Sequence, residues 1–161
     1  MQKITFLTPD FAVAGQLEAA DFAEIARLGF KVIINNRPDG EEDNQLPNHA
    51  AASHASLFGL NYHYIPSGKL ELFSDQVVNA VETAVATADG LVLAYCKSGT
   101  RSAIIWAAAS ARGLPVDEVL ALLLNAGFDF DFLRDDLQLQ AFAGSIYAAD
   151  QETGLALREA A

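Results

Sequence analysis

The stretch from Cys96 to Ser102, Cys-Lys-Ser-Gly-Thr-Arg-Ser, contains residue types that could bind an anion and attack it. It follows an apolar run, 91–95, that is typical of a buried strand, and it precedes an uncharged run, 103–109, that is typical of a helix. The unpaired N–H groups of such a loop converge on one point, where the helix dipole adds positive charge. This field favours thiolate over thiol, so we expect Cys96 to be a nucleophile. Arg101 could hold an oxyanion through two parallel hydrogen bonds.

The elements that must position this loop alternate between strands and helices. The hydrophobic patterns predict strands over 3–7, 11–14, 31–36, 61–66 and 91–95, and helices over 17–28, 47–58, 74–90, 103–109, 116–126 and about 135–147. The segment 128–132 is predicted to be a turn that packs aromatic rings on the core. Alternating units of this kind predict an α/β fold, with a mostly parallel sheet and helices on both faces. We expect a single domain over 1–161, with a tail that frays beyond about residue 150.

In parallel sheets, ligands bind at the carboxyl ends of the strands. Three predicted loops leave such ends, after Asn36, after Pro66 and at Cys96. They should converge on one cleft, which predicts four site-lining residues near Cys96: Arg37, Asp39, Glu42 and Lys69. A solvated turn is an equally good interpretation of the first three, and Lys69 is more often a plain loop lysine.

Composition excludes several classes of partner. Ten basic against twenty-one acidic residues give a formal net charge of −11, so we expect no nucleic acid and no membrane surface as partner. The single cysteine excludes an internal disulfide and a cysteine-based metal cluster, and His49, His54 and His63 lack metal-ligand spacing. No nucleotide-binding motif is present, so we expect neither metal nor cofactor. A free thiol without a signal-peptide pattern favours a cytoplasmic location.

Several stretches together resemble the phosphatase-like domain of the β-lactamase hydrolase-like protein family, a bacterial relative of tyrosine and dual-specificity phosphatases. They are Gly15-Gln16, the segment from Asn35 to Glu41, the strand 64–66 and the loop 95–102. The resemblance implies a three-layer α/β/α sandwich around four or five strands. It implies that Cys96 is the nucleophile and that Ser102 steadies the thiolate. The phosphate-binding loop would then consist of Lys97, Ser98, Gly99, Thr100, Arg101 and Ser102.

Two departures from that family pattern matter. Four residues separate Cys96 from Arg101, where phosphatases have five, and Tyr95 replaces a histidine; both features are similar to rhodanese sulfurtransferases. The segment 67–69 also carries no carboxylate where phosphatases place an aspartate general acid, whose help is typically worth ~10²–10⁴ in rate. The acid could come from Asp39, Glu42, Glu71 or Asp75. Among these we group Asp39 with Cys96 and Arg101 as the catalytic residues.

Three functional hypotheses follow. The first is a cysteine-dependent phosphatase for phosphate monoesters, with phosphotyrosine, a phosphoprotein or another small anionic substrate as the ligand. The second is a sulfurtransferase or persulfide-handling protein, in which Cys96 accepts a sulfane sulfur that the loop amides stabilise. The third is a non-catalytic module that binds anions or phosphoproteins. A separate hydrolase could act as functional partner, and the sequence leaves the oligomeric state open.

Overall fold

The computed structural model describes residues 3–160 and divides the chain into two compact units, Met1–Trp106 and Ala107–Ala161. Compactness does not tell whether either unit folds alone, so the single domain over 1–161 stays a prediction. All the residues predicted for the site belong to the first unit. Among the described residues, no helix combines the length and the apolar character needed to cross a membrane.

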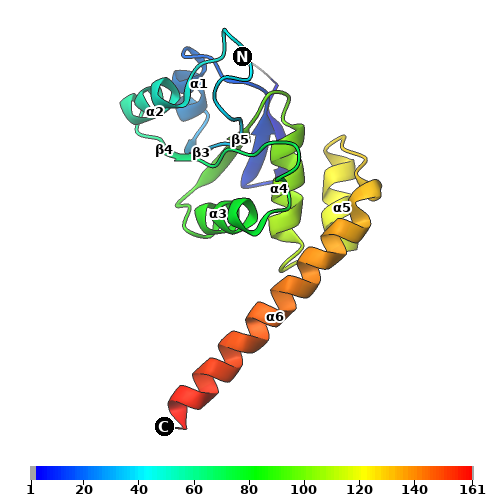
Figure 1. Ribbon diagram of the computed structural model, residues 1–161. Coiled ribbons are helices and arrows are strands. Elements are labelled where there is room, and N and C mark those ends of the chain that lie inside the picture. Colours follow the sequence, from blue (N-terminus) through cyan, green and yellow to red (C-terminus); the bar gives the residue numbers. More distant parts are fainter. Residues whose placement is uncertain (1–2, 161) are drawn as a thin grey trace. The chain divides into compact units, whose positions relative to one another are not determined.

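The first unit is built on a five-stranded sheet (Figure 1). Its strands are β1 (Thr5–Thr8), β2 (Phe11–Ala14), β3 (Phe30–Asn35), β4 (Asn61–Tyr64) and β5 (Leu91–Tyr95). They lie in the order β1-β2-β5-β3-β4; β1 pairs antiparallel with β2, and every other pairing is parallel. The predicted mostly parallel sheet is confirmed. β5 lies between β2 and β3, so the residue that follows it emerges at the centre of the carboxyl edge.

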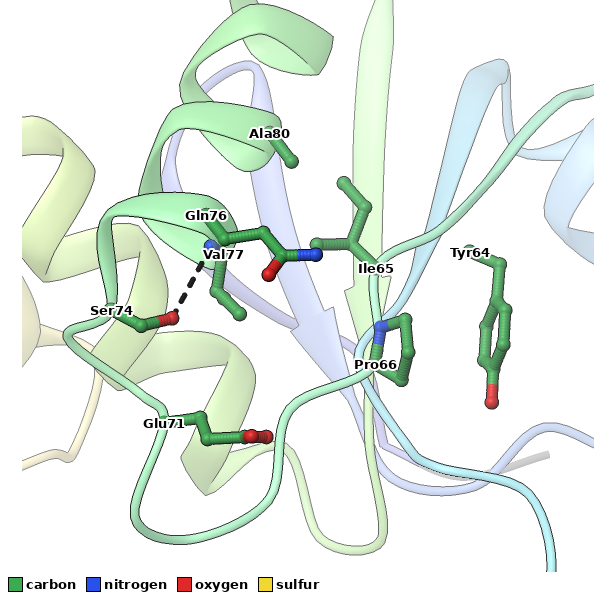
Figure 2. A pocket seen from close by; sticks show the side chains of 8 residues that line it. All are labelled: Tyr64, Ile65, Pro66, Glu71, Ser74, Gln76, Val77 and Ala80. Atoms are coloured by element: carbon green, nitrogen blue, oxygen red, sulfur yellow. Dashed lines mark hydrogen bonds between the residues drawn. The ribbon is translucent and has the colours of Figure 1, made fainter.

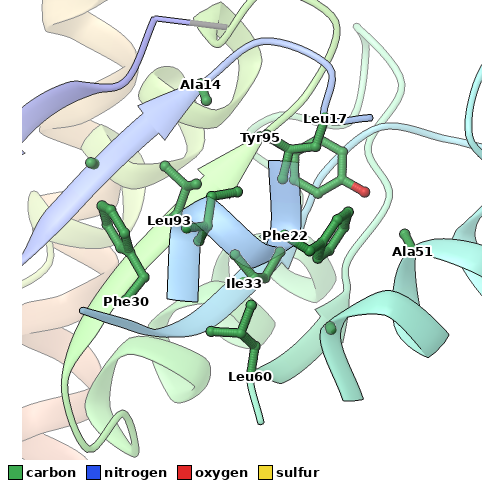
Figure 3. Packing of buried hydrophobic residues seen from close by; sticks show 12 residues of the cluster. Ala14, Leu17, Phe22, Phe30, Ile33, Ala51, Leu60, Leu93 and Tyr95 are labelled. Atoms are coloured by element: carbon green, nitrogen blue, oxygen red, sulfur yellow. The ribbon is translucent and has the colours of Figure 1, made fainter. Parts of the chain in front are cut away.

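Helices cover both faces of this sheet, as predicted. The helices are α1 (Asp21–Arg27), α2 (Asn48–Leu57), α3 (Asp75–Ala86) and α4 (Thr100–Ser110), and α4 continues into the second unit. α1 and α2 pack on one face, where Phe22 and Ala51 join a cluster that includes Ile33 and Tyr95 (Figure 3). On the other face the ring of Phe11 lies 6.0 Å from that of Trp106 in α4. Figure 1 shows α3 beside α4 on that face.

Two helix boundaries differ from the sequence patterns. α1 begins at Asp21 rather than at residue 17, because the Asp21 carboxylate accepts a hydrogen bond from the Glu18 amide and holds the preceding segment in a turn. α4 begins at Thr100, three residues earlier than predicted, directly after Gly99. The helix therefore starts inside the anion-binding motif, and Arg101 lies in its first turn.

The second unit contains α5 (Val116–Asn125), the short 3₁₀ helix η1 (Asp131–Leu133) and α6 (Arg134–Glu159). The segment 128–132 is not a strand, as predicted, but only part of it packs on the core: Phe130 is buried, whereas 74% of Phe132 is exposed. The Phe128 and Phe130 rings lie 5.2 Å apart, and those of Phe130 and Phe132 lie 5.8 Å apart. Arg134 pairs with Asp131 and with a carboxylate of α5. α6 runs beyond the predicted end near residue 147, because no proline interrupts the sequence up to Glu159.

Candidate functional site

Cys96 follows β5 directly and lies at the floor of the loop that leads into α4. Its side chain is buried, and its Sγ accepts a hydrogen bond from the Gly99 amide at 3.2 Å. Gly99 has φ of +90°, and a Cβ atom there would lie 3.3 Å from the carbonyl oxygen of Ala14 in β2. Only glycine suits this left-handed backbone and close approach. The loop thus turns an N–H group toward the sulfur, as the sequence predicted; we call Cys96–Ser102 the cradle.

The Ser102 hydroxyl connects the cradle to the end of β3. Its Oγ donates to Asn36 Oδ1 at 2.9 Å, and both side chains are buried. Asn36 Nδ2 in turn donates to the carbonyl of Ile65 at 2.9 Å. Because a hydroxyl has one proton, Ser102 gives it here to Asn36 and not to the Cys96 sulfur. The three loops predicted to converge are held together by this buried hydrogen-bonded chain.

The Arg101 guanidinium is bound end-on by a carboxylate that the sequence analysis did not select. Nη1 and Nη2 donate to the two oxygens of Glu41 at 2.8 and 2.7 Å, and Nη1 also donates to the Ser67 carbonyl at 3.0 Å. The pKa of Arg101 is raised, chiefly by this bond to Glu41 and further by the charge of Cys96. Arg101 therefore lies within electrostatic reach of the sulfur, and its Nε is not used by Glu41.

Glu41 is held between two guanidinium groups. Besides Arg101, its Oε1 accepts from Nε of Arg37 at 2.9 Å. These partners lower the pKa of Glu41 to about 2, with the hydrogen bond from Arg101 as the largest cause and burial opposing it. Glu41 is therefore ionised at neutral pH. The Pro-Asp-Gly turn just before Glu41 marks a chain reversal in the sequence, but it does not single out Glu41 among the charged residues of the loop.

Arg37, a predicted site-lining residue, is buried at the centre of this arrangement with 2% of its side chain exposed. Its Nη2 donates to Glu42 at 3.0 Å, and Glu42 also pairs with the ammonium group of Lys97 in the cradle. The five residues form an ion-pair network of alternating sign: Lys97, Glu42, Arg37, Glu41 and Arg101. Glu42 thus contacts the cradle directly, through the side chain of Lys97, whereas Arg37 is connected to it through Glu41 and Glu42. The site-lining roles of Arg37 and Glu42 stay predictions.

Gln16 contacts both the ion-pair network and the cradle. Its Oε1 accepts from Nη1 of Arg37 at 2.8 Å, and its backbone amide donates to the Lys97 carbonyl at 3.2 Å. This one residue therefore connects the segment after β2 with both the buried guanidinium and the cradle backbone. Together with the bond from Ser102 to Asn36, this contact connects the cradle to the segments that follow β2 and β3.

Asp39, the predicted third catalytic residue, makes two contacts with the fold. Its amide donates to the Tyr64 hydroxyl at 3.0 Å, and its Oδ1 accepts from the amide of Asn48, the first residue of α2, at 2.8 Å. An acceptor at that position satisfies one of the free N–H groups of a helix start. Lys69 lies exposed on the loop after β4. The catalytic role of Asp39 and the site-lining role of Lys69 stay predictions.

The remaining cradle residues face outward. Ser98 and Thr100 are exposed, and Ser98 Oγ donates to Thr100 Oγ1 at 3.1 Å. Their backbone groups, rather than their side chains, are the parts of a cradle that hold an anion. Within residues 3–160, no three His, Cys, Asp or Glu side chains come together in a way that could hold a metal ion.

A cavity of about 420 Å³ opens beside the segment that contacts Arg101 (Figure 2). Ile65 and Pro66 line it, and the next residue is Ser67, whose carbonyl accepts from Arg101. Glu71 also lines it, and its Oε2 accepts from the Gly68 amide at 3.1 Å. The other lining residues are Tyr64, Ser74, Gln76, Val77 and Ala80. The cavity was not predicted, because it forms between a loop and α3, which sequence patterns do not bring together.

The chain is similar to proteins of known sequence and structure. It is 38% identical to a Beta-lactamase hydrolase-like protein of Xylella fastidiosa over 129 residues, which cover 79% of this chain and 30% of that protein. The relative of the same name from Agrobacterium fabrum is 42% identical over 95 residues, 58% of this chain and 22% of that protein. The chain thus spans less than a third of the length of these curated relatives.

Two solved structures show a similar fold. A candidate phosphatase from Neisseria meningitidis has a TM-score of 0.72 and 33% identity, with 85% of this chain and 97% of that chain covered. Kinase associated phosphatase, solved with its catalytic-site cysteine replaced by serine, has a TM-score of 0.63 at 13% identity over 78% of this chain and 83% of that one. The second likeness concerns the fold alone, which is that of the cysteine phosphatases.

The sequence profile of one family matches residues 3–113, the range that contains the sheet, the cradle and the ion-pair network. The predicted resemblance, including the three-layer α/β/α fold, is confirmed by this match. The chain belongs to the family of phosphatase-like domains of beta-lactamase hydrolase-like proteins.

Proposed function

We propose that this protein is a cysteine-dependent phosphatase that hydrolyses phosphate monoesters. One observation carries the proposal: the buried Cys96 sulfur accepts the Gly99 amide, and Arg101 is held so that its Nε edge is not used by Glu41. A phosphoryl group bound there would place its oxygens on the loop amides and on Arg101, with phosphorus next to the sulfur. The phosphatase-like family and fold support this assignment.

In the proposed reaction, the Cys96 thiolate attacks phosphorus and a phosphocysteine forms while the leaving oxygen departs. Water then attacks the phosphocysteine and regenerates the thiolate. Charge would develop on the equatorial oxygens of the transferring group, where the cradle amides and Arg101 would stabilise it. The catalytic roles of Cys96 and Arg101 are part of this proposal. The proposed substrate is either a small phosphate monoester or a phosphoprotein.

A sulfurtransferase is the second candidate, favoured by the four-residue spacing between Cys96 and Arg101. A shorter loop makes a smaller cradle, which suits one sulfur atom better than a phosphoryl group. In that reaction Cys96 would take the sulfane sulfur of a donor such as thiosulfate, with sulfite as the leaving group. Cyanide would then take the sulfur from the persulfide as thiocyanate.

Parallel turnover of the protein and its Cys96→Ser variant separates these candidates. One assay measures phosphate release from p-nitrophenyl phosphate, and the other measures thiocyanate formed from thiosulfate and cyanide. We expect the protein to release phosphate and the Cys96→Ser variant to release none. Circular dichroism checks that the variant is correctly folded. Thiocyanate without phosphate would establish the sulfurtransferase instead, and silence in both assays would favour the non-catalytic anion-binding module.

A further inference from the structure

The cavity beside Ser67 lies between the segment that follows β4 and the first turns of α3. Its volume is about 420 Å³, which falls within the ~300–1,000 Å³ typical of small-molecule sites. Its apolar walls come from Ile65 and Pro66 on the segment and from Val77 and Ala80 on α3 (Figure 2). A ligand with an apolar body would bury that body between these walls.

Glu71 is the one charged residue among the eight that line this cavity. Its Oε2 accepts a hydrogen bond from the Gly68 amide at 3.1 Å, and Figure 2 shows the side chain reaching across the loop toward the segment that follows Pro66. Within residues 3–160, no ammonium or guanidinium group pairs with this carboxylate, and its Oε1 has no hydrogen-bond partner. The negative charge of Glu71 is therefore available to a cationic ligand.

Two neutral side chains add hydrogen-bonding groups beside Glu71. Figure 2 shows the Gln76 amide pointing from α3 toward Ile65, and within the described residues this amide makes no hydrogen bond. Ser74 Oγ accepts from the Val77 amide at 3.4 Å and can accept a second bond. An ammonium group has three donors, which match one oxygen each from Glu71, Gln76 and Ser74. An anion would instead face the Glu71 carboxylate and the net charge of −11.

We propose that this cavity binds an ammonium group carried on an apolar body. The carboxylate of Glu71 receives the charge, and the walls around Ile65 and Val77 cover the body. This chemistry fits two sources, an amine that belongs to the phosphorylated substrate and a separate small amine. None of the lining residues belongs to the cradle, so only the first source rests on the proposed phosphatase function.

The wall of the cavity is connected to the cradle through the backbone. The Ile65 carbonyl accepts from Asn36 Nδ2 at 2.9 Å, and the Ser67 amide donates to the Asn36 carbonyl at 3.0 Å. The Ser67 carbonyl in turn accepts from Nη1 of Arg101 at 3.0 Å. Pro66, which lines the cavity, is the residue between Ile65 and Ser67. A substrate with a phosphoryl group in the cradle and an amine in the cavity would therefore lie across this one segment of backbone.

Two probes with the same apolar body, 2-phenylethylamine and 2-phenylethanol, differ in charge and so test the role of Glu71. Their binding to the isotope-labelled protein is measured by NMR, through the backbone amide signals of residues 65–77. For a ligand of this size, we expect the amine to bind with a Kd of ~1–10 mM, with the largest shifts at Gly68, Glu71 and Gln76. The alcohol should bind at least ~3-fold more weakly, which is the scale of a partly exposed ion pair.

Three variants test whether the amine lies in this cavity. Glu71→Gln keeps an oxygen for the Gly68 amide but removes the charge, so the affinity for the amine should fall to that for the alcohol. Asp89→Asn is the matched control, because Asp89 is an exposed carboxylate beyond the other end of α3, and it should change neither affinity. Ala80→Leu fills part of the cavity and should weaken both probes. Equal affinities for amine and alcohol, an amine affinity that survives Glu71→Gln or Ala80→Leu, or an equal loss in Asp89→Asn would overturn the inference.

Two phosphate esters identify the source of the amine. They are 4-(2-aminoethyl)phenyl phosphate and 4-ethylphenyl phosphate, which differ by the ammonium group. If the substrate supplies this group, kcat/KM should be at least ~3-fold higher for the amino ester, and the preference should disappear in Glu71→Gln but not in Asp89→Asn. Equal kcat/KM values, together with amine binding that requires Glu71, would assign the cavity to a separate amine. No phosphate release from either ester would refute the proposed function and leave the binding result intact.

Discussion

Replacing Arg37 with methionine is expected to weaken both the fold and the site. Methionine fills much of the buried space but donates no hydrogen bond, so Glu41, Glu42 and Gln16 each lose a partner. Removing one member of a buried ion pair typically costs ~3–5 kcal/mol. The two carboxylates keep Arg101 and Lys97 and are partly exposed, so water and these cations compensate in part. We expect a loss of about 2–3 kcal/mol in the free energy of unfolding.

The loss should appear in activity as well. Glu41 orients Arg101 through two hydrogen bonds and is itself oriented by Arg37. A guanidinium displaced by about 1 Å can lower a rate by up to ~10². We therefore expect kcat/KM for p-nitrophenyl phosphate to fall ~10- to 100-fold in Arg37→Met. Urea titration gives the stability change, and initial rates give the activity change in the same preparation.

Arg27→Met is the matched control. Arg27 pairs with Glu24 on the exposed surface of α1, with 70% of its side chain accessible. Exposed pairs of this type contribute little to stability, so the control should behave like the unmodified protein in both assays. If Arg37→Met were no less stable and no less active than Arg27→Met, the reasoning that a buried guanidinium holds the loop would be refuted.

Two further changes, with one control substitution, test the cradle and its partner Glu41. The pKa of Glu41, lowered from 4.5 to about 2, implies that its ion pairs contribute fully above pH 4.5 and are lost as the pH falls toward 2. Glu41→Gln should therefore be less stable than the unmodified protein at pH 7, and the difference between their melting temperatures should shrink below pH 4.5; a constant difference would contradict this. Gly99→Ala forces a side chain into a left-handed backbone beside Ala14, so we expect a loss of ~1–2 kcal/mol and little phosphate release. Gly59→Ala, with φ of +70° and no atom near the added methyl, should lose stability but keep activity.

The cradle was predictable because its determinants are local. Cys96 follows a short apolar strand, Gly99 permits a left-handed turn, and Arg101 lies in the first turn of an apolar helix. Sequence patterns register such features directly. The parallel sheet followed from the alternation of strands and helices, and with it the convergence of the loops after β3 and β5.

Glu41 was not predictable in the same way. It lies 60 residues from Arg101, and within its own loop it is one of several charged residues that pattern analysis assigns to a solvated turn. The burial of Arg37 was equally hidden, since arginine is almost never fully buried unless it is paired. The pairing depends on the tertiary structure, which brings three distant segments to one edge of the sheet. A charged turn at the carboxyl end of a buried strand therefore justifies testing every acid in it, not only the first.

The ion-pair network explains how an acidic protein can offer a site to an anion. Three cations, Lys97, Arg37 and Arg101, surround two carboxylates, so the network carries a single net positive charge although the chain carries −11. Glu41 uses the far end of the Arg101 guanidinium and so fixes its direction without occupying its Nε. The carboxylates therefore orient the cations that would attract the anionic substrate of the proposed phosphatase.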